Sequence, residues 1–277
     1  MLETLAIADL VARPDRDRAS RVYTVLGERY HLGRRTRYLN LGYWADTQDY
    51  DDACDALAEQ LGLAVGMGEG DRVLDVGFGF ADQDDYWLRR FSPASITGLN
   101  ITPLHVDAAR RRFADPRLDF RLGSATDTRL PAASFDRVTA LECAFHFDTR
   151  EAFFREAFRV LRPGGTLGLA DILPMPGRTS RLDRYFARLT RAFWQIPDAN
   201  WMEQPDYEAA LRRAGFVDVR VRSIRDQVYA PLWERAQAVG RDREASADWN
   251  PVARLLMKLP PRVLDGLDYL VVSATRP

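Results

Sequence analysis

Short aliphatic and β-branched runs alternate with amphipathic stretches of helical period from Arg72 to the end of the chain, which limits the fold more than any other feature. This alternation predicts a mostly parallel sheet with helices on both faces. Helices are expected to begin near Gln83, Pro103, Thr149 and Asp206. Seven strands are expected, at residues 72–76, 95–100, 118–122, 135–141, 165–171, 217–224 and 269–275. The predicted fold class is therefore α/β.

The segments outside this alternation are interpreted as a cap and two lids of one domain. Residues 16–28 and 50–63 space their apolar residues at three and four, and Asp49 or Asp51 is available as an N-cap, so helices are expected before the first strand. Two later interruptions are too long to be bare connections. The predicted division of 1–277 is a helical cap at 1–66, a ligand-binding core at 67–172, lid segments at 173–205 and 225–268, and segments completing the sheet at 206–224 and 269–277.

Aromatic residues are frequent in both lid segments. Each of them can either pack its lid onto the sheet or line a substrate pocket, and both interpretations stay open for any single residue. Taken together, they favour a small, apolar substrate. The residues are Tyr185, Phe186, Phe193, Trp194 and Trp201 in the first lid, and Tyr229, Trp233 and Trp249 in the second.

Composition narrows the partners and the location. The formal net charge of -1 gives no long-range field that attracts phosphate backbones, so nucleic acid is not an expected partner. Cys54 and Cys143 are too few for a disulfide framework or a zinc site. No run approaches the ~18 apolar residues of a membrane span, and the start lacks a signal-peptide pattern, so a cytoplasmic location is expected. No clear heptad or edge-strand signal is present, which leaves homo-oligomer formation open.

Residues 73–83 combine an apolar strand, a turn of small residues and a helix, which is typical of a ligand-binding βα turn. Gly77 and Gly79 let the backbone approach a ligand closely, while the following helix presents unpaired N–H groups to an anion. A dinucleotide motif G-x-G-x-x-G would have its third glycine at position 82, where this chain has Asp82 beside the expected pyrophosphate. A zwitterionic amino-acid group suits this turn better than a pyrophosphate.

The turn resembles the first motif of the class I S-adenosylmethionine-dependent methyltransferases. The motif here is Asp75-x-Gly77-x-Gly79-x-Ala81, with alanine where many members have a third glycine. Further matching segments follow at 96–102, 123–125, 130–136 and 160–165, so that the resemblance covers roughly residues 70 to 175. It implies a Rossmann-like sheet of seven strands and S-adenosyl-L-methionine as the cofactor.

The resemblance also implies which residues bind the methionine end of the cofactor. Asp75 and the residues Gly77, Phe78 and Gly79 would line it, with Gln83 nearby. These residues belong to the strand, the turn and the start of the helix that follows.

For the adenosine end, Asn100 stands where the family usually has an acidic residue that binds both ribose hydroxyls, with Ile101 beside it. An amide can accept one hydroxyl proton and donate to the other oxygen, but it lacks the charge that strengthens such bonds. Ser124 occupies the position of a frequent aspartate near the adenine amino group, and Ala125 would offer its backbone.

Two further segments, 38–44 and 141–147, resemble natural-product methyltransferases, especially the erythromycin-type sugar O-methyltransferases of antibiotic biosynthesis. Sterol, tocopherol and geranyl-diphosphate C-methyltransferases are more distant relatives. In that group the Leu-Gly-Tyr-Trp segment closes over the cofactor. Tyr43 would then form a hydrogen bond with the methionine end, while Trp44 packs against its neighbours. Alternatively, both aromatic rings only pack.

Methyl transfer mainly requires the acceptor to lie in line behind the sulfonium, and such ordering can supply ~7–11 kcal/mol. An alcohol must also lose its proton, for which a positioned base adds ~10²–10⁴-fold. His146, just beyond the fourth strand at the carboxyl edge, is the candidate base; alternatively, it only bonds the lid. Asp171 is expected to orient His146 or to act as base itself. Glu142 is expected to bind the cofactor's ammonium group or the substrate.

The sequence is consistent with three functions. The leading one is O-methylation of a hydroxyl on a small, largely apolar natural product, such as a glycosylated macrolide, with a lipid carboxyl as a variant. The second is C-methylation of an isoprenoid. The third is a cyclase or binding protein that keeps the cofactor without methyl transfer, since a fold does not fix its chemistry. No metal is expected, because Glu142 and Asp171 are too few ligands for one.

Overall fold

The computed structural model describes residues 33–177, 194–241 and 266–277, with residues 20, 21, 23, 24, 185, 187, 188, 190 and 191. The helix expected at 16–28 lies largely outside these residues, as do the lid aromatics Phe186, Phe193 and Trp249. Across the described ranges, no helix combines the length and the apolar character that crossing a bilayer requires.

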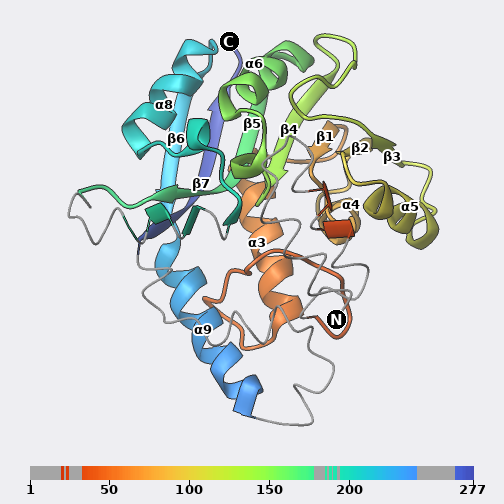
Figure 1. Ribbon diagram of the computed structural model, residues 1–277. Coiled ribbons are helices and arrows are strands. Elements are labelled where there is room, and N and C mark those ends of the chain that lie inside the picture. Colours follow the sequence, from red (N-terminus) through yellow and green to blue (C-terminus); the bar gives the residue numbers. More distant parts are fainter. Residues whose placement is uncertain are drawn as a thin grey trace.

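A single seven-stranded sheet organises the molecule, in the order β3-β2-β1-β4-β5-β7-β6 (Figure 1). Strands β1 to β5 are parallel, and β7 runs antiparallel to both of its neighbours, β5 and β6. The predicted mostly parallel sheet is confirmed. The strands are β1 Arg72–Val76, β2 Ser95–Asn100, β3 Leu118–Leu122, β4 Phe135–Leu141, β5 Leu161–Pro174, β6 Val217–Ser223 and β7 Leu267–Thr275.

The fifth strand is longer than the sequence predicted, because its neighbours extend it at both ends. Leu161 pairs with Phe135 of β4, and Pro174 pairs with Leu267 of β7, so that β5 spans Leu161–Pro174 rather than 165–171. The same pairing starts β7 at Leu267. The ends of β5 and β7 are set by hydrogen-bonded residues on adjacent strands. The local sequence of a strand does not contain this information.

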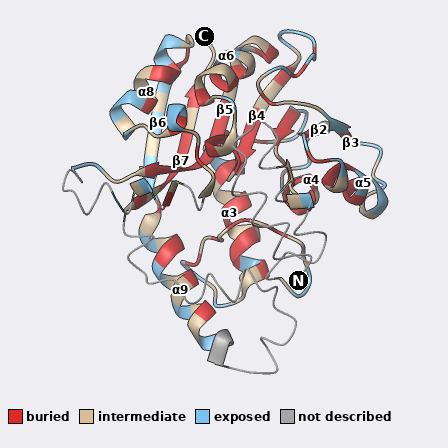
Figure 2. Cartoon of the chain, in the orientation of Figure 1, coloured by how far each residue is buried: buried red, intermediate tan, exposed pale blue. Residues whose placement is uncertain are grey.

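Helices cover both faces of the sheet, and the apolar residues of the central strands alternate between the two layers. On β1, Val73 belongs to the cluster that α3, α4 and α9 cover, whereas Leu74 belongs to the cluster under α6 and α8. Figure 2 shows the buried strands between helices whose outer faces are exposed. The helices are α3 Tyr50–Ala64, α4 Asp82–Phe91, α5 Pro103–Arg112, α6 Arg150–Val160, α8 Gln204–Arg213 and α9 Arg225–Arg241, with short 3-10 turns η1 Ala144–His146 and η2 Asp198–Asn200.

Side-chain N-caps mark the starts of α3 and α6. Of the two candidates before α3, Asp49 is the N-cap, and its side chain accepts the N–H of Asp52. Asp51 is buried and instead accepts backbone N–H groups of the preceding loop. Thr149 caps α6 by accepting the N–H of Ala152. These caps fix the direction in which each helix leaves the edge of the sheet.

Strand order reverses between β1 and β4. From β1 the chain continues outward to β2 and β3, and then returns to the opposite side of β1 as β4. In open α/β sheets the crevice at such a switch point, outside the carboxyl ends of the strands, is where ligands bind. The residues that follow β1, β2 and β4 are therefore the candidates for ligand binding.

Among the residues that the structure describes, one ion pair has no exposed surface. The guanidinium of Arg150, at the start of α6, donates to both carboxylate oxygens of Asp171 on β5 at 2.9 and 2.8 Å, and neither side chain is exposed. Arg150 also donates to the carbonyl of Ile172, and the Tyr207 hydroxyl of α8 donates to Asp171 at 3.1 Å. Each charge is thus compensated by its partners, which ties α6 and α8 to β5.

We expect Asp171→Ala to reduce the free energy of unfolding by ~3–5 kcal/mol, because it leaves a buried guanidinium without its counter-charge. Urea denaturation measures this. The control is Asp119→Ala, which removes an ion pair with Arg121 whose side chains are 51% and 50% exposed; it should cost under ~1 kcal/mol. Equal losses for the two variants would contradict the assignment of Asp171 to the core.

Candidate active site

The backbone between β1 and α4 bends so tightly that one position has no room for a side chain. Gly77 has a φ of +73°, and a Cβ there would lie 2.6 Å from both Cβ and Sγ of Cys143, after β4. Gly79 has a φ of +55°. Ala81 has a φ of +67°, so the position where the family often has a third glycine does adopt the left-handed conformation that glycine favours.

Two acids at this bend have no exposed surface. Asp75, at zero exposure, accepts the Thr139 hydroxyl at 2.7 Å and the Gln83 amide at 3.1 Å, and burial raises its pKa to about 7. Asp84, in the first turn of α4, is also fully buried, and neither of its carboxylate oxygens finds a partner on another described residue. Burial, reinforced by the charge of Asp75, raises the pKa of Asp84 well above its usual value.

The bend fits the amino-acid end of S-adenosylmethionine on two observations. The absent Cβ of Gly77 makes room for Cys143 and lets the main chain take the left-handed turn before α4, and no described residue gives the buried carboxyl of Asp84 a cationic partner. An ammonium group would supply that charge. Asp84 could not be predicted from the sequence, because acids are common in the first turn of a helix and nothing in the pattern shows which one faces inward.

Phe78 was predicted to line the cofactor, but its side chain points elsewhere. It is fully buried against Phe120 of β3, with 5.0 Å between the ring centroids. Only the main chain of Phe78 can therefore face a ligand at the bend. The hydrophobic ring instead fixes the bend to the sheet.

The residues predicted for the adenosine end follow β2 and β3 at the same edge. Asn100 is buried; its Oδ1 accepts the Thr102 N–H at 2.9 Å, and its Nδ2 lies 3.4 Å from Nδ1 of His105. One amide proton and one lone pair remain for a ribose. Ile101 is exposed beside Asn100.

In the loop after β3, the Ser124 hydroxyl contacts the Thr126 hydroxyl at 3.0 Å and accepts the Thr126 N–H at 3.2 Å. Ala125 is buried in the core cluster under α6 and α8, so its backbone rather than its methyl group is available. Both positions agree with the edge on which the sequence placed them; their contacts with adenine stay predictions.

Glu142 fastens the Leu-Gly-Tyr-Trp segment to the sheet. Its Oε1 accepts the Leu41 N–H at 2.7 Å and the hydroxyl of Tyr269 on β7, and burial raises its pKa to about 7. The indole of Trp44 is buried and donates to the Leu41 carbonyl at 2.8 Å, while Tyr43 is half-buried. The contacts of Glu142 with Leu41 and Tyr269 could not be predicted, since neither residue is near it in sequence.

His146 ends η1, directly after β4, where the sequence placed it. Its ring lies 4.3 Å from that of Phe145 and edge-on to that of Tyr23 at 6.2 Å. The main-chain carbonyl of Gln195 accepts a hydrogen bond from the ring, and burial lowers the pKa of His146 to about 4. Nδ1 has no partner among the described residues. Nε2 therefore carries the hydrogen, and Nδ1 keeps a free lone pair.

The structure contradicts both roles predicted for Asp171. Both of its oxygens are taken by Arg150, and by Tyr207 and the Ile172 N–H, and its side chain has no exposed surface. Its hydrogen-bond partners among the described residues do not include His146, and its carboxylate has no exposed surface through which a substrate could reach it. A polar residue at the carboxyl end of a strand looks catalytic in the sequence, but here a buried arginine from α6 takes its charge.

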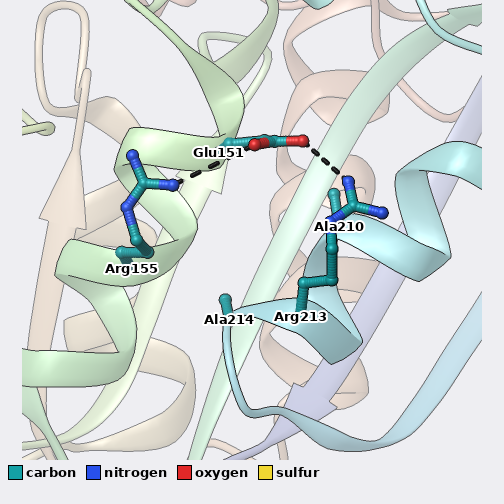
Figure 3. A pocket seen from close by; sticks show the side chains of 5 residues that line it. All are labelled: Glu151, Arg155, Ala210, Arg213 and Ala214. Carbon is teal, nitrogen blue, oxygen red and sulfur yellow. Dashed lines mark hydrogen bonds and ion pairs between the residues drawn. The ribbon is translucent and has the colours of Figure 1, made fainter.

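A hollow of about 180 Å³ lies elsewhere, between α6 and α8 (Figure 3). None of the predicted site residues lines it. The Glu151 carboxylate accepts from Arg213 at 2.7 Å and pairs with Arg155 at 4.0 Å, which offsets the arginine charges. The residues that line this hollow are Glu151, Arg155, Ala210, Arg213 and Ala214.

In the part of the chain that the structure describes, no three His, Cys, Asp or Glu side chains are grouped to hold a metal ion.

Comparison with known proteins decides the family. Residues 74–169 match the family described as "Methyltransferase domain". The chain is 42% identical to the erythromycin 3''-O-methyltransferase of Saccharopolyspora erythraea, over 94% of this chain and 90% of that protein. The chain belongs to the S-adenosylmethionine-dependent methyltransferases. The predicted family and cofactor are thereby confirmed.

Solved structures share the fold of this methyltransferase. The geranyl diphosphate C-methyltransferase of Streptomyces coelicolor, solved with S-adenosyl-L-homocysteine, is 19% identical over 83% of this chain and 81% of that chain, with a TM-score of 0.67. The [4+2]-cyclase SpnF is 21% identical over 87% of both chains, with a TM-score of 0.68. At these identities the likeness establishes the fold alone, and the predicted Rossmann-like fold class is confirmed.

We expect Gly77→Ala to weaken the binding of S-adenosylhomocysteine by at least ~10-fold, because left-handed strain of ~1–2 kcal/mol is joined by a collision with Cys143. Titration calorimetry measures the affinity. Gly70→Ala is the matched control: its φ of +86° gives the same strain, but nothing lies within 4 Å of the added Cβ. If the two variants bound the ligand equally well, the bend would not be the binding turn.

Proposed function

We propose that this methyltransferase transfers the methyl group of S-adenosylmethionine to a hydroxyl of a small, largely apolar natural product, such as a glycosylated macrolide. The observation that carries the proposal is the neutral imidazole of His146, whose Nδ1 lone pair is unused at the carboxyl edge of the sheet. An alcohol acceptor needs such a base, because its oxygen must lose a proton as it is methylated. The likeness to an enzyme named for O-methylation of erythromycin supports the same substrate class.

When bound, the cofactor supplies an electrophilic methyl group, and the chain's task is to hold and orient. The Gly77 bend, with Asp75 and Asp84, would bind the methionine end, with Gln83 orienting Asp75. Asn100 would bind the ribose through its remaining proton and lone pair. These contacts leave the side of the site towards η1 for the acceptor.

His146 would take the hydroxyl proton of the acceptor on Nδ1. Because Nε2 already donates to the Gln195 carbonyl, the imidazolium formed there keeps a hydrogen-bonded second nitrogen, which stabilises it. Glu142 would act indirectly, by holding Leu41 and the segment that follows it over the methionine end.

The two rival functions share this fold, since one neighbour is named as a C-methyltransferase and another as a cyclase. Incubation with S-[methyl-¹³C]adenosylmethionine and a panel of glycosylated macrolides and isoprenoid diphosphates separates them. NMR of the product should show the label as an ether methyl on a macrolide sugar. A label on carbon would favour the isoprenoid function, and cofactor that binds but keeps its methyl group with every acceptor would favour the cyclase or binding function.

We expect His146→Ala to lower kcat by ~10²–10⁴-fold, the range that a positioned base supplies, and to leave the affinity for S-adenosylhomocysteine unchanged. Because burial lowers the pKa of His146 to about 4, the ring is unprotonated at neutral pH, and wild-type kcat should fall only as the pH approaches about 4. Steady-state kinetics across pH, with calorimetry on the same variant, measures both. Unchanged kcat, or an equal loss of cofactor affinity, would remove His146 from the role of base.

A further inference from the structure

The side-chain amide of Asn200 holds the backbone on both sides of His146. Asn200 ends η2 and has no exposed surface. Its Nδ2 donates to the carbonyl of Phe145 at 3.1 Å and to the carbonyl of Phe147 at 2.7 Å. The residue between these two carbonyls is His146, so the amide closes the turn that carries the imidazole.

The chemistry of this contact is specific to a carboxamide. Both Nδ2 protons are used, and Oδ1 accepts the main-chain N–H of Arg150 at 2.8 Å. These partners fix the orientation of the amide, since carbonyls accept and an N–H donates. Aspartate has the same size but offers no proton to the two carbonyls, and alanine offers nothing.

Asn200 is itself held by the buried ion pair. The Arg150 guanidinium donates to the main-chain carbonyl of Asn200 through Nη1, and it is fixed in turn by Asp171. A continuous set of bonds thus runs from β5 through Arg150 and Asn200 to η1. The same stretch of chain meets His146 a second time, because the main-chain carbonyl of Gln195 accepts from the imidazole.

We propose that Asn200 is a positioning residue for methyl transfer, which holds η1 so that Nδ1 of His146 faces the acceptor hydroxyl. The inference rests on the base role proposed for His146. The end of the segment 173–205 would then orient the base: Gln195 contacts the imidazole of His146, and Asn200 holds the backbone on either side of it. Arg150 and Asp171 contribute to positioning through Asn200. Besides burial, their opposite charges act on the pKa of His146 in opposite directions, Asp171 raising it and Arg150 lowering it.

A double-mutant cycle with Asn200→Ala and His146→Ala tests this role. Asn200→Ala should lower kcat about 10- to 100-fold and change the affinity for S-adenosylhomocysteine less than about twofold, because the amide's contacts are to the turn that carries the base. In the His146→Ala background, Asn200→Ala should cause no further loss of kcat. A residue that acts through the base has nothing left to act on once the base is gone.

Two further measurements separate positioning from general stability. Val160→Ala, a core change at the end of α6 where β5 begins, at the edge of the sheet opposite η1, should lower Tm while leaving kcat near the wild-type value. In Asn200→Ala, the acid limb of the kcat profile should move up from about pH 4 toward the ordinary histidine value of about 6.5, because a loosened turn admits water to the ring. Asn200→Asp keeps the size and the acceptor but lacks both protons, and it should behave like Asn200→Ala.

The outcomes distinguish the two proposals. If His146→Ala keeps full activity, the base role fails, and the positioning role fails with it. If His146→Ala is slow but either Asn200 variant multiplies that loss in the double variant, the base stands and the positioning role is overturned. Should Asn200→Ala fail to fold, the same cycle with Asn200→Asp decides the question.

Discussion

The bend after β1 is the constraint around which the rest of the site is arranged. Because Gly77 lies against Cys143 without space for a Cβ, β1 and β4 are brought together at the point where the strand order reverses. The residues that follow β2 and β4 then reach the same edge as the buried Asp75. A larger residue at Gly77 would separate the strands whose ends form the site.

Buried charge is used in two different ways in this protein. At the bend, Asp75 and Asp84 are buried with few partners, a costly arrangement that a cationic ligand would relieve. In the core, the charges of Asp171 and Arg150 compensate each other, and the main-chain N–H of Arg150 donates to the side chain of Asn200. We therefore propose that buried acids with few partners mark the binding site, whereas the buried acid with a matched arginine is structural.

Much of the fold could be predicted because its causes are local. Most strands are rich in aliphatic and β-branched residues, and the bend at Gly77 requires glycines that the sequence displays directly. The extension of β5 to Pro174 could not be predicted, because it depends on pairing with Leu267. The roles assigned to Asp171 were wrong for the same reason, since its partner Arg150 begins a helix elsewhere in the chain. No sequence pattern indicates a role for Asn200, which is visible only from its contacts with the carbonyls of Phe145 and Phe147.

The central claim is that the cofactor's amino-acid end lies in the bend and its methyl group points toward His146. A crystal structure with S-adenosylhomocysteine tests this most directly. The account predicts the ligand's ammonium group near Asp75 and Asp84, its ribose at Asn100, and its sulfur facing the space beside Nδ1 of His146. A ligand bound in the hollow between α6 and α8, or a sulfur turned away from His146, would contradict it.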